Sequence, residues 1–155
     1  MPTKSFRGLL ADGAIDTIPL STNNGSTGYR ITKMQLIGEQ PGTTNIESTV
    51  KIFSIPQTTA TNNIDFSDNT LLAAGYYAKG NNTAEVQSDI VVFDNMTFNQ
   101  DIYVTAVETQ GSEPTNYYIE LEQIKLSLDE NTVATLKDIK NIEGSNLSIT
   151  WSNII

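Results

Sequence analysis

Two glutamates, Glu120 and Glu122, have the spacing of a carboxylate pair that could perform acid–base chemistry. Glycoside hydrolysis runs on two carboxylic acids and needs no histidine. The pair lies in NYYIELEQIKLSL, where a strand would place both carboxylates on one face, opposite the apolar residues. A solvated strand face is the simplest explanation of such a pair. We therefore predict no catalytic residue and no enzymatic activity.

The stretch STNNGSTGYR, residues 21–30, has the glycines and small polar residues of a phosphate-binding loop. A Walker loop requires GxxxxGK[ST], but Gly25 and Gly28 are only three residues apart and a tyrosine stands where the lysine should be. A dinucleotide fingerprint requires a following helix, whereas the residues up to Ile37 are typical of a strand. Asn24 and Gly25 both tolerate positive φ and form a strong hairpin signal. We predict a turn that holds no phosphate.

Acidic and amide side chains gather in IDFSDN and VVFDN, which contain Asp65, Asp68, Asn69 and Asp94. Calcium takes oxygen ligands, but the twelve-residue EF-hand pattern with its terminal glutamate is absent. Asx-turns, in which such a side chain bonds to the backbone two residues ahead, explain the same residues. The four residues are therefore calcium candidates with a structural alternative, and we predict no metal and no cofactor.

The composition excludes several classes of site. The chain has no cysteine and no histidine, which removes thiol nucleophiles, disulfides, the Ser-His-Asp triad and the usual zinc ligands. Its formal net charge of −9, from 18 acidic and 9 basic residues, disfavours contact with nucleic acid and anionic lipid. No apolar run approaches the roughly 18–20 residues of a membrane span, and the first residues lack an apolar signal core. We expect a soluble protein made in the cytoplasm, with no nucleic-acid or membrane partner.

Short segments rich in β-branched and aromatic residues recur along the chain, with turn-forming residues between them. This pattern is typical of a sandwich or barrel. We predict a mainly β fold, an antiparallel and jelly-roll-like β-sandwich, as a single domain spanning residues 1–155. The predicted strands are Lys4–Leu10, Ala14–Leu20, Tyr29–Ile37, Ser48–Ile55, Leu71–Tyr77, Asp89–Phe93, Asp101–Val107 and Tyr117–Leu128.

The last predicted strand changes the phase of its alternation. Because side chains of a strand alternate between faces, keeping all its apolar residues on the core side requires one extra residue, as a β-bulge supplies. We predict a bulge near Gln123; the alternative is that the strand bends and passes from one sheet to the other. The two apolar sets are Tyr117, Ile119 and Leu121, then Ile124, Leu126 and Leu128.

Residues 129–155 are predicted to extend the sandwich by a helix and a tail. Apolar residues recur every third position from Val133 to Ile142, Asp129 can act as N-cap, and Gly144 suits the C-terminal left-handed position. These signals predict one short helix over Glu130–Glu143. The closing NLSITWSNII alternates again and is interpreted as a last strand or a docking tail.

Two pairs of adjacent tyrosines lie in predicted strands, Tyr76–Tyr77 and Tyr117–Tyr118. Neighbouring side chains face opposite sides, so one of each pair should be in the core and the other exposed or at an interface. A sugar platform is an alternative use of the exposed rings, and we predict an interface with copies of the protein or with a host surface. The interface candidates are Tyr76, Tyr77, Tyr117, Tyr118, Leu147, Ile149 and Trp151.

Several long strings of the sequence resemble one group of known proteins: FRGLLADG, TGYRI, IDFSDNTLLAAGYY, FNQDIYVT and NYYIELE. They span most of the chain, from about Ser5 to Lys125, and are similar to small structural proteins encoded by tailed phages of marine bacteria. The resemblance implies a virion protein with a β-sandwich or jelly-roll-like domain, present in many copies. It brings no catalytic signature with it.

The leading expectation is a capsid decoration or cement protein, attached to the phage head in many copies and located in the virion. Its partners would be phage structural proteins, chiefly the major capsid protein, and copies of itself in a homo-oligomer. Apolar terminal segments would anchor it, with an acidic face towards solvent. A tail or neck component, such as a receptor-binding or adaptor protein, is the first alternative. A carbohydrate-binding domain that uses Glu120, Glu122 and the tyrosines is the second.

Overall fold

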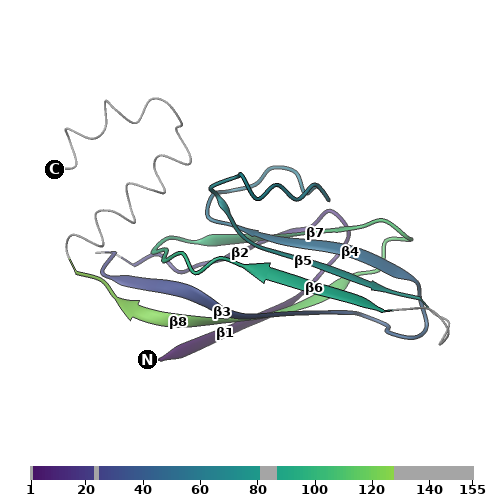
Figure 1. Cartoon of the computed structure of the whole chain (residues 1–155), viewed down its shortest axis with the longest axis horizontal. Helices are drawn as coiled ribbons and strands as arrows, with labels where there is room; N and C mark the ends of the chain where they lie inside the picture. Colours follow the sequence, from purple (N-terminus) through teal and green to yellow (C-terminus); the bar gives the residue numbers. More distant parts are fainter. Residues whose placement is uncertain (1, 23–24, 81–86, 128–155) are drawn as a thin grey trace.

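The chain folds into two layers of strands (Figure 1). The computed structural model describes residues 2–22, 25–80 and 87–127, and these residues contain eight strands and no helix. The predicted helix at Glu130–Glu143 and the closing segment with Leu147, Ile149 and Trp151 lie outside the described residues. The strands are β1 (Thr3–Leu10), β2 (Ile15–Ile18), β3 (Thr27–Gly38), β4 (Ile46–Phe53), β5 (Leu71–Lys79), β6 (Ser88–Phe93), β7 (Ile102–Glu108) and β8 (Thr115–Lys125).

The strands form two antiparallel sheets that pack face to face, which confirms the predicted β-sandwich. Sheet A has the order β1-β8-β3, and sheet B has the order β2-β7-β4-β5-β6. The pairs β1–β8, β2–β7 and β4–β5 are nested one inside the other, as in a jelly roll. A regular jelly roll would also pair β3 with β6. Here β6 pairs with β5 instead and forms one edge of sheet B.

Strand β8 shows how alternation builds the core. Ile119 and Leu121 are completely buried between the sheets, whereas Tyr118 and Glu120 point to the outer face of sheet A. Each fully buried aliphatic side chain stabilises the fold by about 1.5–3 kcal/mol. The same alternation on the facing strands of sheet B buries Val50, Ile52, Ile102 and Val104.

The irregularity predicted near Gln123 is not a bulge in β8. The residues of β8 pair consecutively with β3, and the extra residue is Thr32, in β3. The phase change has a different cause, because β8 ends at Lys125 and Leu126 is then buried beside Gly28. Alternation holds only within a strand, so a buried residue just after the strand end imitates a bulge in the sequence.

The stretch at residues 21–30 connects the two sheets. β2 lies in sheet B and β3 in sheet A, so the predicted hairpin is wrong, although Gly25 has the expected positive φ, 64°. Asp101 holds the connection, because its Oδ1 accepts hydrogen bonds from the backbone N–H groups of Leu20 (2.8 Å) and Ser21 (2.9 Å). The positive φ of Gly25 agrees with the prediction, but the place of the stretch in the topology does not.

The two sheets approach closely where β3 faces β5. A Cβ atom on Gly75 would lie 2.6 Å from Cδ1 of Leu36 and 3.3 Å from Cε of Met34. Both side chains are buried in the core, where close packing leaves them little space to move. A glycine at position 75 therefore allows side chains of sheet A to rest directly on the backbone of sheet B.

A buried carboxylate organises the loop that follows β7. Burial acts to raise the pKa of the Glu108 carboxyl, but hydrogen bonds from four backbone N–H groups outweigh it and lower the pKa below its usual value. The loop includes Ser112 with a φ of 73°, a conformation that serine seldom adopts. The N–H donors belong to Gln110 (2.7 Å), Gly111 (2.8 Å), Ser112 (2.6 Å) and Glu47 (3.2 Å).

The packing at Gly75 predicts that Gly75→Ala destabilises the protein. The added methyl group must displace Leu36, and such overpacking costs about 1–3 kcal/mol. Urea unfolding measures the change. Gly111→Ala is the matched control, because a Cβ atom there has no neighbour within 4 Å, and it should change stability by less than about 0.5 kcal/mol. Equal stability of the two variants would contradict the packing argument.

The Glu108 site predicts a pH-dependent loss of stability. Because its pKa is lower in the folded protein than in the unfolded chain, the ionised carboxylate stabilises the fold above the usual value of 4.5, and this contribution is lost as the pH falls through the folded pKa. We expect Glu108→Gln to cost about 1–3 kcal/mol near neutral pH, since its amide cannot accept all four bonds.

Urea unfolding of wild type and Glu108→Gln at neutral and acidic pH tests this expectation. The difference between the two proteins should shrink below pH 4.5. Glu39→Gln, at an exposed position near the same end of the sandwich, is the control and should leave stability unchanged. A Glu108→Gln deficit that is constant over the whole pH range would argue against the carboxylate as its origin.

Candidate functional site

An exposed apolar surface lies on the edge strand β6 and on the loop of residues 54–70. We define the β6 patch as Phe66 in this loop together with Ile90, Val92 and Phe93 on the strand. Phe66 and Ile90 are 69% and 61% exposed, and Val92 and Phe93 are 48% and 39% exposed. Large apolar side chains at this exposure, on a strand whose outer edge pairs with no other described strand, are the features of an interaction site.

A buried lysine fastens the loop to sheet B. Lys51 of β4 points away from the core, and its ammonium group donates hydrogen bonds to the carbonyl of Asn63 (2.6 Å) and to Oγ1 of Thr61 (3.1 Å). Residues 54–70 thus lie over the outer face of sheet B (Figure 1), and Lys51 is only 4% exposed. These hydrogen bonds hold the loop that carries Phe66 against the outer face of sheet B.

Two consecutive Asx-turns shape the part of the loop around Phe66. Oδ1 of Asp65 accepts hydrogen bonds from the N–H (3.0 Å) and the hydroxyl (2.6 Å) of Ser67. Oδ1 of Asp68 accepts the corresponding bonds from Thr70, at 2.8 and 2.7 Å. The hydroxyl and then the N–H of Ser67 lower the pKa of Asp65. The turns set the course of the backbone around Phe66, whose side chain is mostly exposed.

The calcium candidates are explained by this turn geometry. Asp68, Asn69 and Asp94 line one pocket, whereas Asp65 does not line it. Asp94 also makes a turn, because its Oδ1 accepts a hydrogen bond from the N–H of Met96 (2.9 Å). Within the described ranges, no group of three or more acidic side chains is placed to hold a metal ion. We therefore assign Asp65, Asp68 and Asp94 to loop structure.

The pocket beside the β6 patch has a volume of about 430 Å³. Its lining combines apolar side chains with carboxylate and amide groups. Such a pocket suits a large apolar side chain of a partner that is flanked by basic residues, the arrangement of an interface hot spot. The lining consists of Phe66, Leu71, Leu72, Ala73, Val92, Phe93 and Met96, with Asp68, Asn69 and Asp94.

The tyrosine pairs alternate as predicted. Tyr77 and Tyr117 are buried in the core, at 3% and 5% exposure, whereas Tyr76 and Tyr118 are partly exposed on the outer faces of sheets B and A. Tyr76 pairs with Ile90 across β5 and β6, so it adjoins the β6 patch. The alternation is confirmed, and the interface role of the exposed members stays a prediction.

Both glutamates of the carboxylate pair have partners on the outer face of sheet A. Glu120 accepts a hydrogen bond from the hydroxyl of Tyr118 (2.7 Å), and Glu122 forms an ion pair with Arg30 (2.6 Å). The Arg30 and Glu122 side chains are 40% and 23% exposed, which makes the pair a surface interaction worth little stability. This geometry agrees with the solvated strand face that the sequence favoured.

The β6 patch was missed by the sequence analysis. DIVVF was predicted as a strand, but its run of apolar residues is typical of a strand buried on both faces, and the sequence does not show that β6 is an edge. Ile64 and Phe66 gave an available signal, because they are large apolar residues in TNNIDFSDN, a segment of turn-forming residues.

No protein-family model matches the chain, and no curated protein shows significant similarity to it. Among the described residues, no helix has the length and apolar character to cross a membrane. The functional assignment therefore depends on the geometry of the surfaces and on the resemblance described above, and the phage origin stays a prediction.

The role of Lys51 predicts that Lys51→Met releases the loop. Burial lowers the pKa of the Lys51 amine, with Asp68 opposing the shift, so the amine is held under the loop at a desolvation cost. Removing it leaves the carbonyl of Asn63 without its donor. We expect backbone amides in residues 54–70 to exchange hydrogen about 10-fold faster or more, while the core strands keep their protection.

Hydrogen exchange followed by mass spectrometry measures this effect. Lys79→Met, which removes a lysine at the end of β5, is the control and should leave the loop unchanged. Unaltered exchange of residues 54–70 in Lys51→Met would show that the lysine does not hold the loop.

Proposed function

We propose that this protein is a non-catalytic attachment protein of a phage virion, most specifically a decoration or cement protein that covers the capsid in many copies. The observation that carries the proposal is the β6 patch. Its partner is the major capsid protein, and it lies next to further copies of itself. The resemblance to phage structural proteins supplies the biological setting, and the patch supplies the means of attachment.

An exposed apolar surface such as the β6 patch is unusual in a protein that has no binding partner. Edge strands are usually shortened, charged or covered, because their unpaired backbone groups invite another strand. Here Ile90 and Val92 expose apolar side chains on the same face of such a strand, and Phe66 extends the apolar surface onto the loop. Docking would bury these side chains and could add a strand to sheet B.

Charge adds to the specificity of this surface. The chain carries a net charge of −9, so neighbouring copies repel one another unless the partner surface is basic or the apolar contact is strong. Asp68 and Asp94 in the lining of the pocket favour a partner with lysine or arginine around its apolar anchor. Many identical sites on a capsid lattice would make modest affinity per copy sufficient.

A tail or neck component, such as a receptor-binding or adaptor protein, could use the same patch, and the two locations differ in copy number. Quantitative mass spectrometry of particles of the phage that encodes the chain should find hundreds of copies per particle for a head protein. About six or twelve copies, as in a closed ring, would favour the neck or tail. Absence from purified particles would refute both.

The attachment surface is tested with the double variant Phe66→Ser, Val92→Ser. Each side chain contributes about 1.5–3 kcal/mol when buried, so binding to particles stripped of the native protein should weaken about 100-fold or more. Because both residues are exposed, thermal stability should not change. Cosedimentation with the stripped particles measures the affinity.

The matched control is Leu9→Ser, Ile37→Ser, which removes two exposed apolar side chains from sheet A. It should bind the particles like wild type. Full binding by the Phe66 and Val92 variant, or an equal loss in the control, would show that attachment does not use the β6 patch.

A further inference from the structure

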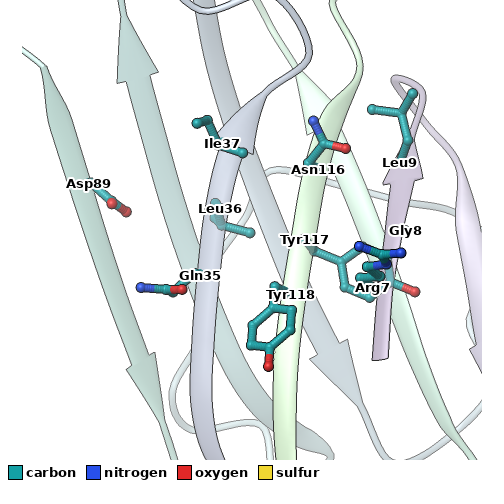
Figure 2. Close-up of a pocket in the computed structure, with 10 residues that line it drawn as sticks. All are labelled: Arg7, Gly8, Leu9, Gln35, Leu36, Ile37, Asp89, Asn116, Tyr117 and Tyr118. Carbon is teal, nitrogen blue, oxygen red and sulfur yellow. The ribbon is translucent and has the colours of Figure 1, made fainter. Parts of the chain in front are cut away.

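A second hollow lies on the other layer of the sandwich, across the outer face of sheet A (Figure 2). It has a volume of about 650 Å³, within the usual range for small-molecule sites. The hollow crosses β1, β8 and β3 and reaches Asp89 of β6. We call it the sheet A groove. None of its lining residues belongs to the β6 patch.

The register of sheet A sets two rows of side chains in the groove. Arg7, Tyr118 and Gln35 occupy directly paired positions on β1, β8 and β3, and Leu9, Asn116 and Ile37 form the next outward row. Paired positions in neighbouring strands are about 5 Å apart, so each row spans about 10 Å. Strands hold these groups in fixed relative positions, as a recognition site requires.

The polar members of these rows are available to a ligand. Within the part of the chain that the structure describes, the side chains of Arg7, Gln35 and Asn116 have no hydrogen bond or ion pair. A guanidinium group offers five donors, and each amide offers both a donor and an acceptor. An amide can therefore bind two adjacent hydroxyl groups at once, accepting a bond from one and donating to the other.

An aromatic ring lies among these polar groups and is held in place. The hydroxyl of Tyr118 donates to Glu120 (2.7 Å), and Nζ of Lys33 lies 5.9 Å from the ring centroid. Figure 2 shows the ring over β8 with its hydroxyl pointing away from Asn116. Leu9 and Ile37, at 46% and 50% exposure, add apolar surface beside it. Ring and aliphatic groups offer contact to the C–H faces of a sugar.

The lining disfavours other classes of ligand. Nucleic acid or phosphate would need several cations, but Arg7 is the only cationic side chain among the described lining residues, and Lys33 lies beside the Tyr118 ring. Asp89 lies at the far side of the groove, and the chain is strongly acidic. A purely apolar partner would bury the guanidinium and the two amides without hydrogen bonds, and each buried unsatisfied group destabilises such a complex. A neutral polyhydroxyl ligand satisfies both the polar and the apolar lining.

We infer that the sheet A groove binds a neutral oligosaccharide, with Gln35, Asn116 and Arg7 bonding to hydroxyl groups and the Tyr118 ring supporting a sugar face. Glu120 is a positioning residue that orients Tyr118, and Glu122 lies outside the groove. The site goes beyond attachment. The loop with Phe66 covers the outer face of sheet B, so a protein docked through that loop turns sheet A outward, where a glycan can reach it (Figure 1).

Isothermal titration calorimetry of the full chain tests the inference. The neutral probes are maltohexaose, cellohexaose, laminarihexaose and chitohexaose, and an alginate hexasaccharide is the charged comparison. We expect at least one neutral probe to bind. Asn116→Ala and Tyr118→Ala should each weaken its binding about 10-fold or more. Tyr118→Phe keeps the ring and loses the hydroxyl that bonds to Glu120, so the decrease in affinity should be smaller.

Gln35→Ala should also weaken glycan binding. Gln35 is an exposed residue of the edge strand β3, so this variant should fold even if Tyr118→Ala does not. Phe66→Ser, in the β6 patch, is the control and should bind the glycan like wild type. The inference is overturned if no neutral probe binds, if only the alginate probe binds, or if Gln35→Ala and Asn116→Ala leave the affinity unchanged.

Discussion

The distance between the two sheets is the constraint on which the other contacts depend. Gly75 allows Leu36 to rest on the backbone of β5, so the sheets come close enough for polar side chains to bridge them. Thr115 of sheet A donates a 2.6 Å hydrogen bond to Ser48 of sheet B, and both residues are buried. A wider spacing would leave these hydroxyls without partners in the core, at a cost comparable to a lost hydrogen bond.

The same spacing fixes the far edge of the sandwich. The ring of Tyr117 passes over Gly8 of β1, and its hydroxyl donates to the carboxylate of Asp16 in β2 (3.1 Å). A Cβ atom on Gly8 would lie 2.7 Å from this ring, so the small residue is needed for the ring to cross. Burial and then the charge of Asp16 raise the pKa of the Tyr117 hydroxyl, which therefore stays a hydrogen-bond donor.

The positions of the strands could be predicted from the sequence, but the order in which they pair could not. The alternation of Tyr117 to Leu121 identifies both a strand and its inward face, and all eight strands were predicted within a few residues of their ends. Which strands pair with each other depends on residues far apart in the sequence. The sequence therefore does not reveal that the chain passes from sheet B to sheet A between β2 and β3, or that β6 lies at the edge of sheet B. The site was predicted least well, because the exposure of Phe66 depends on Lys51, fifteen residues earlier in the chain.

The position of β8 at the centre of sheet A has a consequence for the order of folding. Thr3 pairs with Glu122, and β3 has its ladder with the same strand, so neither β1 nor β3 has its sheet partner until β8 leaves the ribosome. The hairpins β4–β5 and β5–β6 can form much earlier, from neighbouring segments. During synthesis there is therefore an interval in which strands of sheet B can pair while their apolar inner face is still uncovered, because sheet A has not yet formed. Long-range pairing of this kind makes folding slow, and the nascent chain is most open to misassembly during that interval.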